Sequence, residues 1–235
     1  MRRKKLFGAM ARKEGVSPQE FHDHYRHPHG TMGMRISTLR EYVQSHQIHT
    51  DWLDETQRRF EAIAELWFDN ASDLLHFRTE PTMASYLNDD EPRFVDLRNT
   101  RLFIGEEDVV TSQPDAALYE ADAANAKWRL SDRPVSVKII QFIAPEAGSE
   151  WCSPDDEALG RALGVFRHVR CHPTTPTSIV PTRAQRPPDF IGTRELWWPT
   201  CTAFDQAVTA NPEAWRRLVM RKHVHTLLAQ AERWR

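Results

Sequence analysis

Residues 21–30 read Phe21-His22-Asp23-His24-Tyr25-Arg26-His27-Pro28-His29-Gly30, and Ser17-Pro18-Gln19-Glu20 directly precedes them. Ser17 is a good helix N-cap, Pro18 suits the first helical position, and Glu20 completes a capping box. Because a residue before proline is disfavoured in the α region, we expect the helix to end near His27. His29 then falls at the end of a short helix, where its side chain can point into a cavity.

This stretch also carries a family resemblance. A strand followed by Ser-Pro-x-x-Phe-x-x-x-Tyr-Arg-x-x-His-Gly resembles the signature of the EthD family, whose usual form is Tyr-Trp-Arg-x-x-His-Gly-Pro. The chain departs from that form because Arg26 directly follows Tyr25 and Thr31 replaces the final proline. The resemblance implies a ferredoxin-like, dimeric α+β-barrel fold. Its relatives include cofactor-free isomerases such as the muconolactone methylisomerases, and polyketide-tailoring enzymes.

Composition limits the possible partners. The 235 residues suffice for one large domain or two of roughly 110. A net charge of −2 gives no global electrostatic reason to expect nucleic acid or an acidic membrane as a partner. We expect neither a signal peptide nor a membrane span, because no apolar stretch is long enough. Three scattered cysteines suit a reducing cytoplasm.

The first half of the chain reads as one ferredoxin-like domain, residues 1–112. Its predicted order is strand, helix, strand, strand, helix, strand, which is the ferredoxin-like arrangement. The strands are expected at 6–12, 39–46, 62–68 and 101–110, and the helices at 17–28, 71–78 and from 81 through 87. Residues 113–134 read as a linker with one helical stretch around 116–126.

The second half, residues 135–235, repeats the pattern in degenerate form. Strands are expected at 135–143, 168–172 and 193–198, and helices at 155–163, 203–210 and 212–219. Residues 226–234 read as a closing strand, with a terminal helix as the competing interpretation. We interpret the two halves as diverged copies of one unit that close a pseudo-dimeric α+β barrel within one chain. A homodimer remains possible.

The two halves are unequal in their candidate chemistry. The second half has no counterpart of Tyr25 to His29, so we expect one working site, in the first half. Alternation along a strand places Tyr42, Gln44 and His46 on one face, and Glu65 and Trp67 share a face of the next strand. We predict that the barrel interior holds His46, Tyr42, Glu65 and Trp67, with His29 entering from the helix end.

This set can carry out proton transfer, because imidazole titrates near neutrality. We expect His29 to act as general acid or base with His46 as its partner, while Tyr42 and Glu65 orient the reacting groups. The remaining predicted substrate-binding residues are Tyr25, Gln44, Trp67, His172 and Trp197. The reaction would be cofactor-independent isomerisation, elimination or dehydration of a small, apolar substrate that is aromatic-derived, a lactone or polyketide-like.

Structural roles compete with each of these assignments. His29 can cap its helix, His46 has a counterpart in His172, and Glu65, which recurs as Glu195, can pair with an arginine. The two tryptophans can be core residues. No Cys-x-x-Cys or His-Glu-x-x-His pattern is present, so we expect no protein-bound metal. A non-catalytic ligand-binding or accessory barrel and a haem- or oxygen-dependent activity are the alternative functions.

Overall fold

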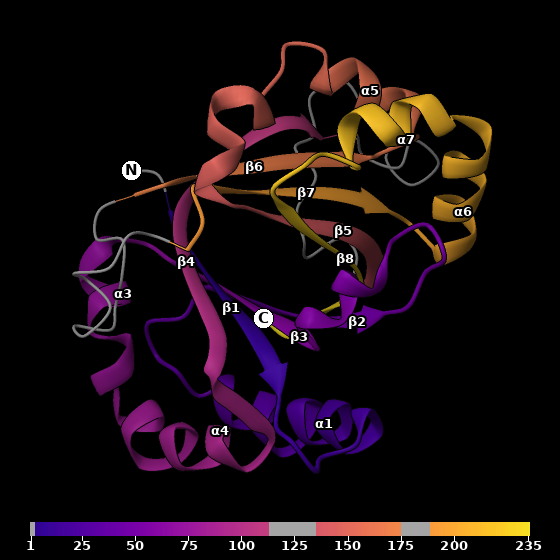
Figure 1. Ribbon diagram of the computed structural model, residues 1–235. Helices are drawn as coiled ribbons and strands as arrows, with labels where there is room; N and C mark the ends of the chain where they lie inside the picture. The colour runs from indigo at the N-terminus through magenta and orange to yellow at the C-terminus, as the bar shows by residue number, and fades with distance from the viewer. Residues whose placement is uncertain (1–2, 113–134, 175–188) are drawn as a thin grey trace, which may run out of the picture.

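The computed structural model describes residues 3–112, 135–174 and 189–235. Within these ranges, eight antiparallel strands close a barrel in the order β1-β3-β2-β8-β5-β7-β6-β4 (Figure 1). The strands are β1 (Lys4–Arg12), β2 (Glu41–Ile48), β3 (Ala62–Phe68), β4 (Val95–Ser112), β5 (Val135–Ile143), β6 (Arg167–Pro173), β7 (Gly192–Trp198) and β8 (Val224–Arg233). The chain therefore has an α+β fold built on a closed barrel.

The strand order is the same in both halves of the barrel. The first four strands lie as β4-β1-β3-β2 and the last four as β8-β5-β7-β6, and β2–β8 and β4–β6 pairs join the two sets. The expected strands at 62–68 and 135–143 agree with β3 and β5. The C-terminal segment is strand β8, so the terminal-helix alternative is wrong. The predicted linker, 113–134, lies outside the described residues.

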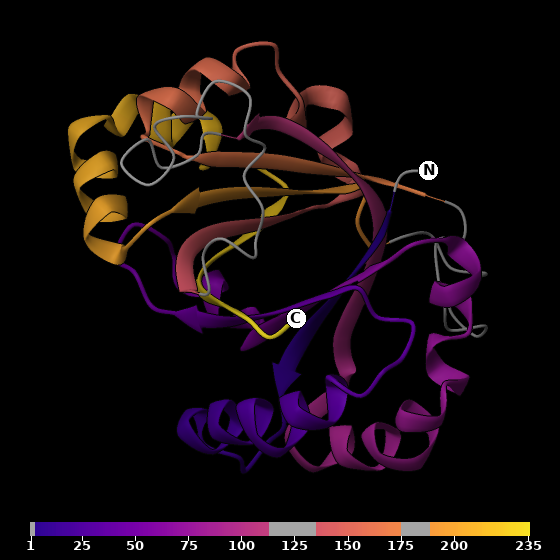
Figure 2. The ribbon, with the colours of Figure 1, turned by 180° about the vertical axis from the view of Figure 1, so that it is seen from behind.

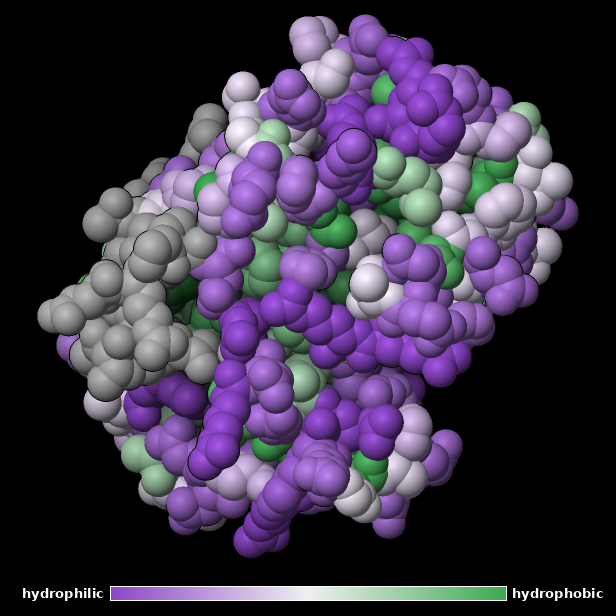
Figure 3. All heavy atoms as spheres, in the orientation of Figure 1, coloured by the Kyte–Doolittle hydropathy of each residue, from purple (hydrophilic) through white to green (hydrophobic). Residues whose placement is uncertain are grey.

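The helices lie outside the barrel, in two groups. Figures 1 and 2 show the first-half helices on one side of the barrel and the second-half helices on the opposite side. They are α1 (Pro18–His24), α2 (Thr31–Gly33), α3 (Ala71–Leu75), α4 (Asn88–Phe94), α5 (Asp156–Ala162), α6 (Cys201–Ala210) and α7 (Pro212–Leu218). No helix of the described residues is both long and apolar enough to cross a bilayer. The face in Figure 3 is largely hydrophilic, with smaller hydrophobic areas between.

Local sequence signals set the path of the chain around α1. Ser17 accepts a hydrogen bond from the Glu20 amide at 3.2 Å, and the Glu20 carboxylate accepts one from the Ser17 amide at 2.8 Å, so the expected capping box is confirmed. His27 has an extended backbone, with φ −139° and ψ 123°, as expected before proline. The chain then re-enters a helical turn, which places His29 in a buried position.

The barrel interior is filled. One part of it is an apolar cluster rich in phenylalanine, including Phe7, Phe103 and Phe142. Beside this cluster lie two lysines and two glutamates, which we call the interior quartet: Lys5, Glu65, Lys138 and Glu195. The four side chains are at most 1% exposed. The barrel interior is therefore a packed core that contains buried charge.

Each lysine of the interior quartet bridges both glutamates. Lys5 Nζ lies 3.0 Å from Glu65 and also contacts Glu195, and Lys138 Nζ lies 2.8 Å from Glu195 and also contacts Glu65. The ammonium groups also lie over indole rings, Lys5 at 4.2 Å from the Trp67 ring centre and Lys138 at 4.0 Å from that of Trp197. Alternating charge and cation–π contact compensate for the loss of hydration.

Candidate functional site

The candidate site is a cavity between the first-half helices and the outer face of the first-half sheet. It has a volume of about 230 Å³. Its polar lining comes from His29, Tyr42, Thr100 and the Arg78–Glu91 ion pair, whose closest atoms are 3.1 Å apart. The apolar lining includes Leu6, Met10, Leu66, Phe77, Met83 and Leu87. Since a cavity of about 150 Å³ can hold benzene, this one has room for a ligand of one or two rings.

The register of β2 against β3 corrects the predicted composition of the site. Tyr42 lies opposite Leu66, whereas Val43 lies opposite Glu65. Directly paired residues project to the same face of a sheet. Tyr42, Gln44 and His46 therefore face the helices, and Glu65 and Trp67 face the barrel interior. The prediction that one interior chamber holds them all is wrong, because alternation within a strand does not tell which face is inside.

His29 has a buried carboxylate partner that the sequence analysis missed. His29 Nδ1 lies 2.9 Å from Asp90 Oδ2 in α4, and His24 Nε2 lies 2.9 Å from Asp90 Oδ1. Burial alone would raise the pKa of Asp90, but the hydrogen bonds from His29 and His24 outweigh it and lower the pKa. Asp90 is thus an acceptor, and His29 donates through Nδ1. The available signal was the acidic run Asp89-Asp90-Glu91, which directly follows the helix expected from 81 through 87.

The hydrogen bond to Asp90 leaves Nε2 of His29 for a ligand. Nε2 makes no hydrogen bond to any described residue, and His29 is part of the cavity wall. The ring is held between Tyr25 and Phe94, whose ring centres lie 5.6 and 5.2 Å away. A neutral imidazole with Nδ1 protonated exposes a basic nitrogen, so this arrangement suits a general base.

Tyr42 provides the second polar group of the cavity. Burial raises the pKa of its phenol to about 12, against the opposing effect of hydrogen bonding from Gln44. Gln44 Nε2 donates to the Tyr42 hydroxyl at 2.8 Å and to the Tyr25 carbonyl at 2.7 Å. The Tyr42 phenol therefore stays neutral at physiological pH and keeps a proton to donate. Tyr25 itself packs behind His29 and is not part of the cavity lining.

His46 lies behind the cavity wall. Its Nδ1 is 2.8 Å from Nδ1 of His22, and its Nε2 is 3.3 Å from the Gln44 side-chain oxygen. Burial, followed by the charge of Arg26, lowers the pKa of His46 to about 3, so the ring is neutral. His46 does not line the cavity, and its predicted partnership with His29 is not a direct contact. His46 is connected to Tyr42 by two hydrogen bonds, both of which involve the Gln44 side chain.

The other predicted site residues lie elsewhere. Glu65 pairs with lysines inside the barrel and accepts a hydrogen bond from Ser45 at 2.6 Å. Trp67 and Trp197 are buried beside the interior quartet. His172 is half exposed at the end of β6, with its ring centre 5.3 Å from that of Trp151. None of these four side chains lines the cavity.

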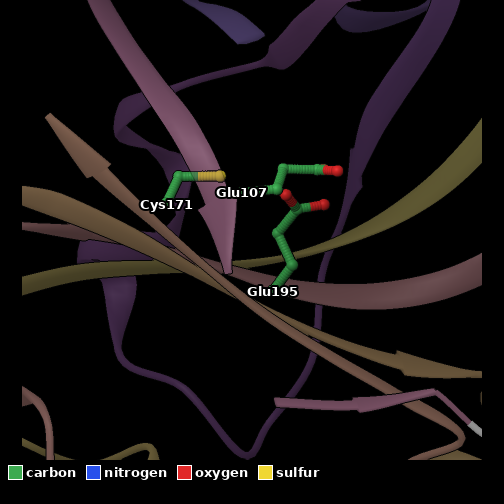
Figure 4. Close-up of side chains that lie close together, drawn as sticks. All are labelled: Glu107, Cys171 and Glu195. Carbon is green, nitrogen blue, oxygen red and sulfur yellow. The ribbon is translucent and has the colours of Figure 1, made fainter. Parts of the chain in front are cut away.

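A possible metal-ligand group lies inside the barrel and is already associated with a cation. Ligand atoms of Glu107, Cys171 and Glu195 lie within 4.8 Å of one another (Figure 4). Lys5 Nζ lies 3.1 Å from Glu107 and also contacts Glu195. Because a metal ion would have to displace this buried ammonium group, the geometry favours an ion-pair network over a metal centre.

The corresponding place in the second half is occupied by large polar side chains. Gly8 of β1 pairs with Ala64 of β3 in the first half, and both line the cavity. In the second half the pair at the same place in the strand order is Gln141 of β5 and Arg194 of β7. Their buried side chains hydrogen-bond at 3.0 Å, and Arg194 also binds Asp156 of α5 at 2.6 Å. Large polar side chains thus occupy the space that small residues leave open in the first half.

Comparison with known proteins agrees with this picture. Residues 13–98 match the family model of the EthD domain, and this segment contains His29, Tyr42 and Asp90. The matched segment also holds most of the cavity wall. The curated proteins contain no match.

Solved structures share the fold at low sequence identity. An anthrone oxidase-like protein is 8% identical with a TM-score of 0.58, over 99% of this chain and 93% of that one. A provisionally assigned monooxygenase of Fusobacterium nucleatum subsp. nucleatum is 6% identical with a TM-score of 0.50, over 99% and 92%. A provisionally assigned chlorite dismutase is 12% identical with a TM-score of 0.50, over 98% and 95%. These likenesses show an α+β-barrel fold.

Proposed function

We propose that the chain is an enzyme that transfers a proton at carbon in a small, largely apolar ring compound, as an isomerase or lyase without a cofactor. One observation carries this proposal: a histidine oriented by a buried carboxylate presents its free nitrogen to an apolar cavity. The cavity volume and lining favour an aromatic-derived ketone, a lactone or a polyketide-like ring.

The proposed reaction uses His29 and Tyr42 together. His29 Nε2 removes a proton from a carbon next to a carbonyl group, and the electron pair of the broken C–H bond forms an enolate. The Tyr42 hydroxyl donates a hydrogen bond to the enolate oxygen, and Asp90 stabilises the imidazolium. Return of the proton to another carbon completes an isomerisation. Departure of a leaving group on the adjacent carbon, protonated by His29, completes an elimination.

A second candidate is oxygenation of the same deprotonated substrate by molecular oxygen. Two structural neighbours, an anthrone oxidase-like protein and a provisionally assigned monooxygenase, give a reason to test it. A haem-dependent reaction has less support, since a cavity of about 230 Å³ does not have room for a four-ring macrocycle. We derive no step through haem.

The tandem arrangement is part of the proposal. We propose that residues 1–112 and 135–235 are two copies of one ferredoxin-like unit, the first catalytic and the second structural. The equal strand orders support this, as do the matched interior pairs Lys5 and Lys138, Glu65 and Glu195.

Three free cysteines are compatible with a cytoplasmic location.

Deuterium exchange into 2-tetralone tests the proposed function. This two-ring ketone has acidic C–H groups beside its carbonyl, and the cavity can hold two rings. The wild-type protein in D₂O should accelerate exchange at those carbons, measured by proton NMR, without consuming oxygen. Binding without exchange would support the non-catalytic ligand-binding alternative. Oxygen consumption would support the second candidate.

Filling the cavity should block the ligand without unfolding the protein. Ala64→Leu places a larger apolar side chain where the second half has Arg194, and we expect 2-tetralone binding to weaken at least about tenfold. Thermal unfolding should shift little or upward, since the added methyl groups fill empty space. Ala210→Leu, at the exposed end of α6, is the matched control. Unchanged affinity in Ala64→Leu, measured by calorimetry, would place the ligand elsewhere.

A further inference from the structure

A line of hydrogen bonds runs behind the cavity wall from Tyr42 to the protein surface. It passes from Tyr42 to Gln44, then to His46 and His22, and ends at Glu61. Gln44, Tyr42 and His46 share the outer face of β2, whereas His22 belongs to α1. The direction of each hydrogen bond can be derived from the one group whose role is fixed.

That group is the Tyr25 carbonyl oxygen, which can only accept. Gln44 Nε2 lies 2.7 Å from this oxygen, so the nitrogen of the amide must be on that side. The amide oxygen then faces His46 Nε2 at 3.3 Å, which requires a proton on Nε2. The amide cannot be flipped without setting two acceptors against each other.

The protons of the two histidines follow from this orientation. Because neutral His46 is protonated on Nε2, its Nδ1 is an acceptor and must receive the Nδ1 proton of His22, 2.8 Å away. His22 Nε2 lies 3.1 Å from Glu61, which also accepts from Arg12 at 2.9 Å. Burial alone would raise the pKa of Glu61. The hydrogen bonds from His22 and Arg12 have the larger effect, so the pKa lies below its ordinary value. Glu61 is therefore an acceptor at the surface end of this line, shared by Arg12 and His22.

The same orientation fixes the role of the Tyr42 oxygen. It accepts from Gln44 at 2.8 Å, so its own hydrogen is not used in that contact. The neighbouring Tyr25 hydroxyl lies outside regular hydrogen-bond geometry, but it interacts with the Tyr42 hydroxyl and, like Gln44, opposes the rise in the pKa of Tyr42. The Arg26–Glu232 ion pair flanks His46, with Glu232 3.7 Å from Nε2, too far to replace Gln44 as its partner.

We propose that Glu61, His22, His46 and Gln44 form a positioning chain that keeps Tyr42 as a hydrogen-bond donor to the cavity, so that the site selects ligands with a carbonyl or phenolate oxygen. The inference rests on the proposed function for the location of the ligand. His46 is accordingly a positioning residue that acts through Gln44. Gln44 keeps the Tyr42 oxygen as an acceptor, and His46 supports the Gln44 amide oxygen while the Tyr25 carbonyl holds its nitrogen. Loss of Gln44 or of His46 therefore loosens the Tyr42 hydroxyl and reduces the preference for an oxygen acceptor.

A matched pair of probes measures that preference. Acetophenone and α-methylstyrene have nearly the same shape, but the second has a methylene group in place of the carbonyl oxygen. The wild-type protein should bind acetophenone about 3- to 10-fold more tightly, the range for one neutral hydrogen bond. Tyr42→Phe, Gln44→Leu and His46→Leu should each bring the two affinities together. His168→Leu, a buried histidine of the second half, should retain the preference.

Nitrogen-15 NMR of the histidine rings in the wild-type protein gives an independent readout. We expect His46 to be neutral with its proton on Nε2, and His22 to carry a proton on Nδ1. Equal probe affinities, an Nδ1 proton on His46, or a preference that survives in Gln44→Leu and His46→Leu would overturn the positioning chain. If both probes bind equally while His29 still catalyses exchange, this inference fails and the proposed function stands. If neither probe binds but the ring protonation is as expected, the location of the ligand is what fails.

Discussion

His29→Ala will lower the rate of deuterium exchange into 2-tetralone by about 10²- to 10⁴-fold, the range for loss of a positioned general base. The substitution removes the nitrogen that faces the cavity and leaves the apolar walls in place. Affinity for 2-tetralone should therefore change much less than the exchange rate. Calorimetry and proton NMR on the same sample separate the two quantities.

Two further variants test whether the effect of His29→Ala comes from the His29–Asp90 pair. Asp90→Asn keeps the shape of the partner but removes its charge, and it should slow exchange by about 10- to 100-fold, since a hydrogen bond to a charged group contributes about 1.5–3 kcal/mol. His27→Gln, on an exposed ring of the same turn that contacts Thr31 at 2.9 Å, should exchange at nearly the wild-type rate. Wild-type exchange by His29→Ala would remove His29 from the mechanism.

The sequence predicted the local features of this site because local interactions determine them. The capping box of α1, the extended His27 and the bounds of β3 depend on neighbouring residues, and the structure confirms each. The position of His29 at the end of the helical turn follows from these features. The cavity that His29 lines was not predicted, since His29 was expected to enter the barrel interior, not the space under the helices.

Contacts between residues that are far apart in the sequence could not be predicted from local signals. Asp90 lies 61 residues after His29, and nothing near it in the sequence pairs it with a histidine. The face on which Tyr42 and Glu65 lie depends on the register between β2 and β3 and on which sheet face closes the barrel. Period-two alternation leaves both choices open, so the predicted chamber combined residues from opposite faces.

The interior quartet had a signal that the sequence analysis did not use. Lys138 stands within the apolar run Val137 to Ile143, and the repeated glutamates Glu65 and Glu195 occupy equivalent strands. A lysine in the middle of a buried strand needs a carboxylate partner. Arginine was the expected partner of these glutamates, whereas each glutamate pairs with two lysines, one on the adjacent strand and one from across the barrel.

Lys138→Met should lower the free energy of unfolding by about 3–5 kcal/mol, the range for breaking a buried ion pair by removing one partner. The remaining interior would hold two buried glutamates against one lysine. Adding Glu65→Gln to Lys138→Met restores the charge balance, so the double variant should be more stable than Lys138→Met alone. Urea unfolding of the three proteins measures these differences. As a control, Arg216→Met breaks an exposed pair with Glu213 and should cost less than about 1 kcal/mol.

The effect of Lys138→Met should depend on pH in a definite direction. Burial alone would raise the pKa of Glu195, but Lys138 and Lys5 outweigh it and hold the pKa well below 4.5. The unfolded chain takes up a proton at Glu195 as the pH falls past that value, and the folded chain does not. The stability contributed by the quartet is therefore complete above about pH 5 and declines toward pH 2. The unfolding free energies of wild-type and Lys138→Met should converge over that range; a constant difference would show that lost packing, not the ion pairs, accounts for the effect.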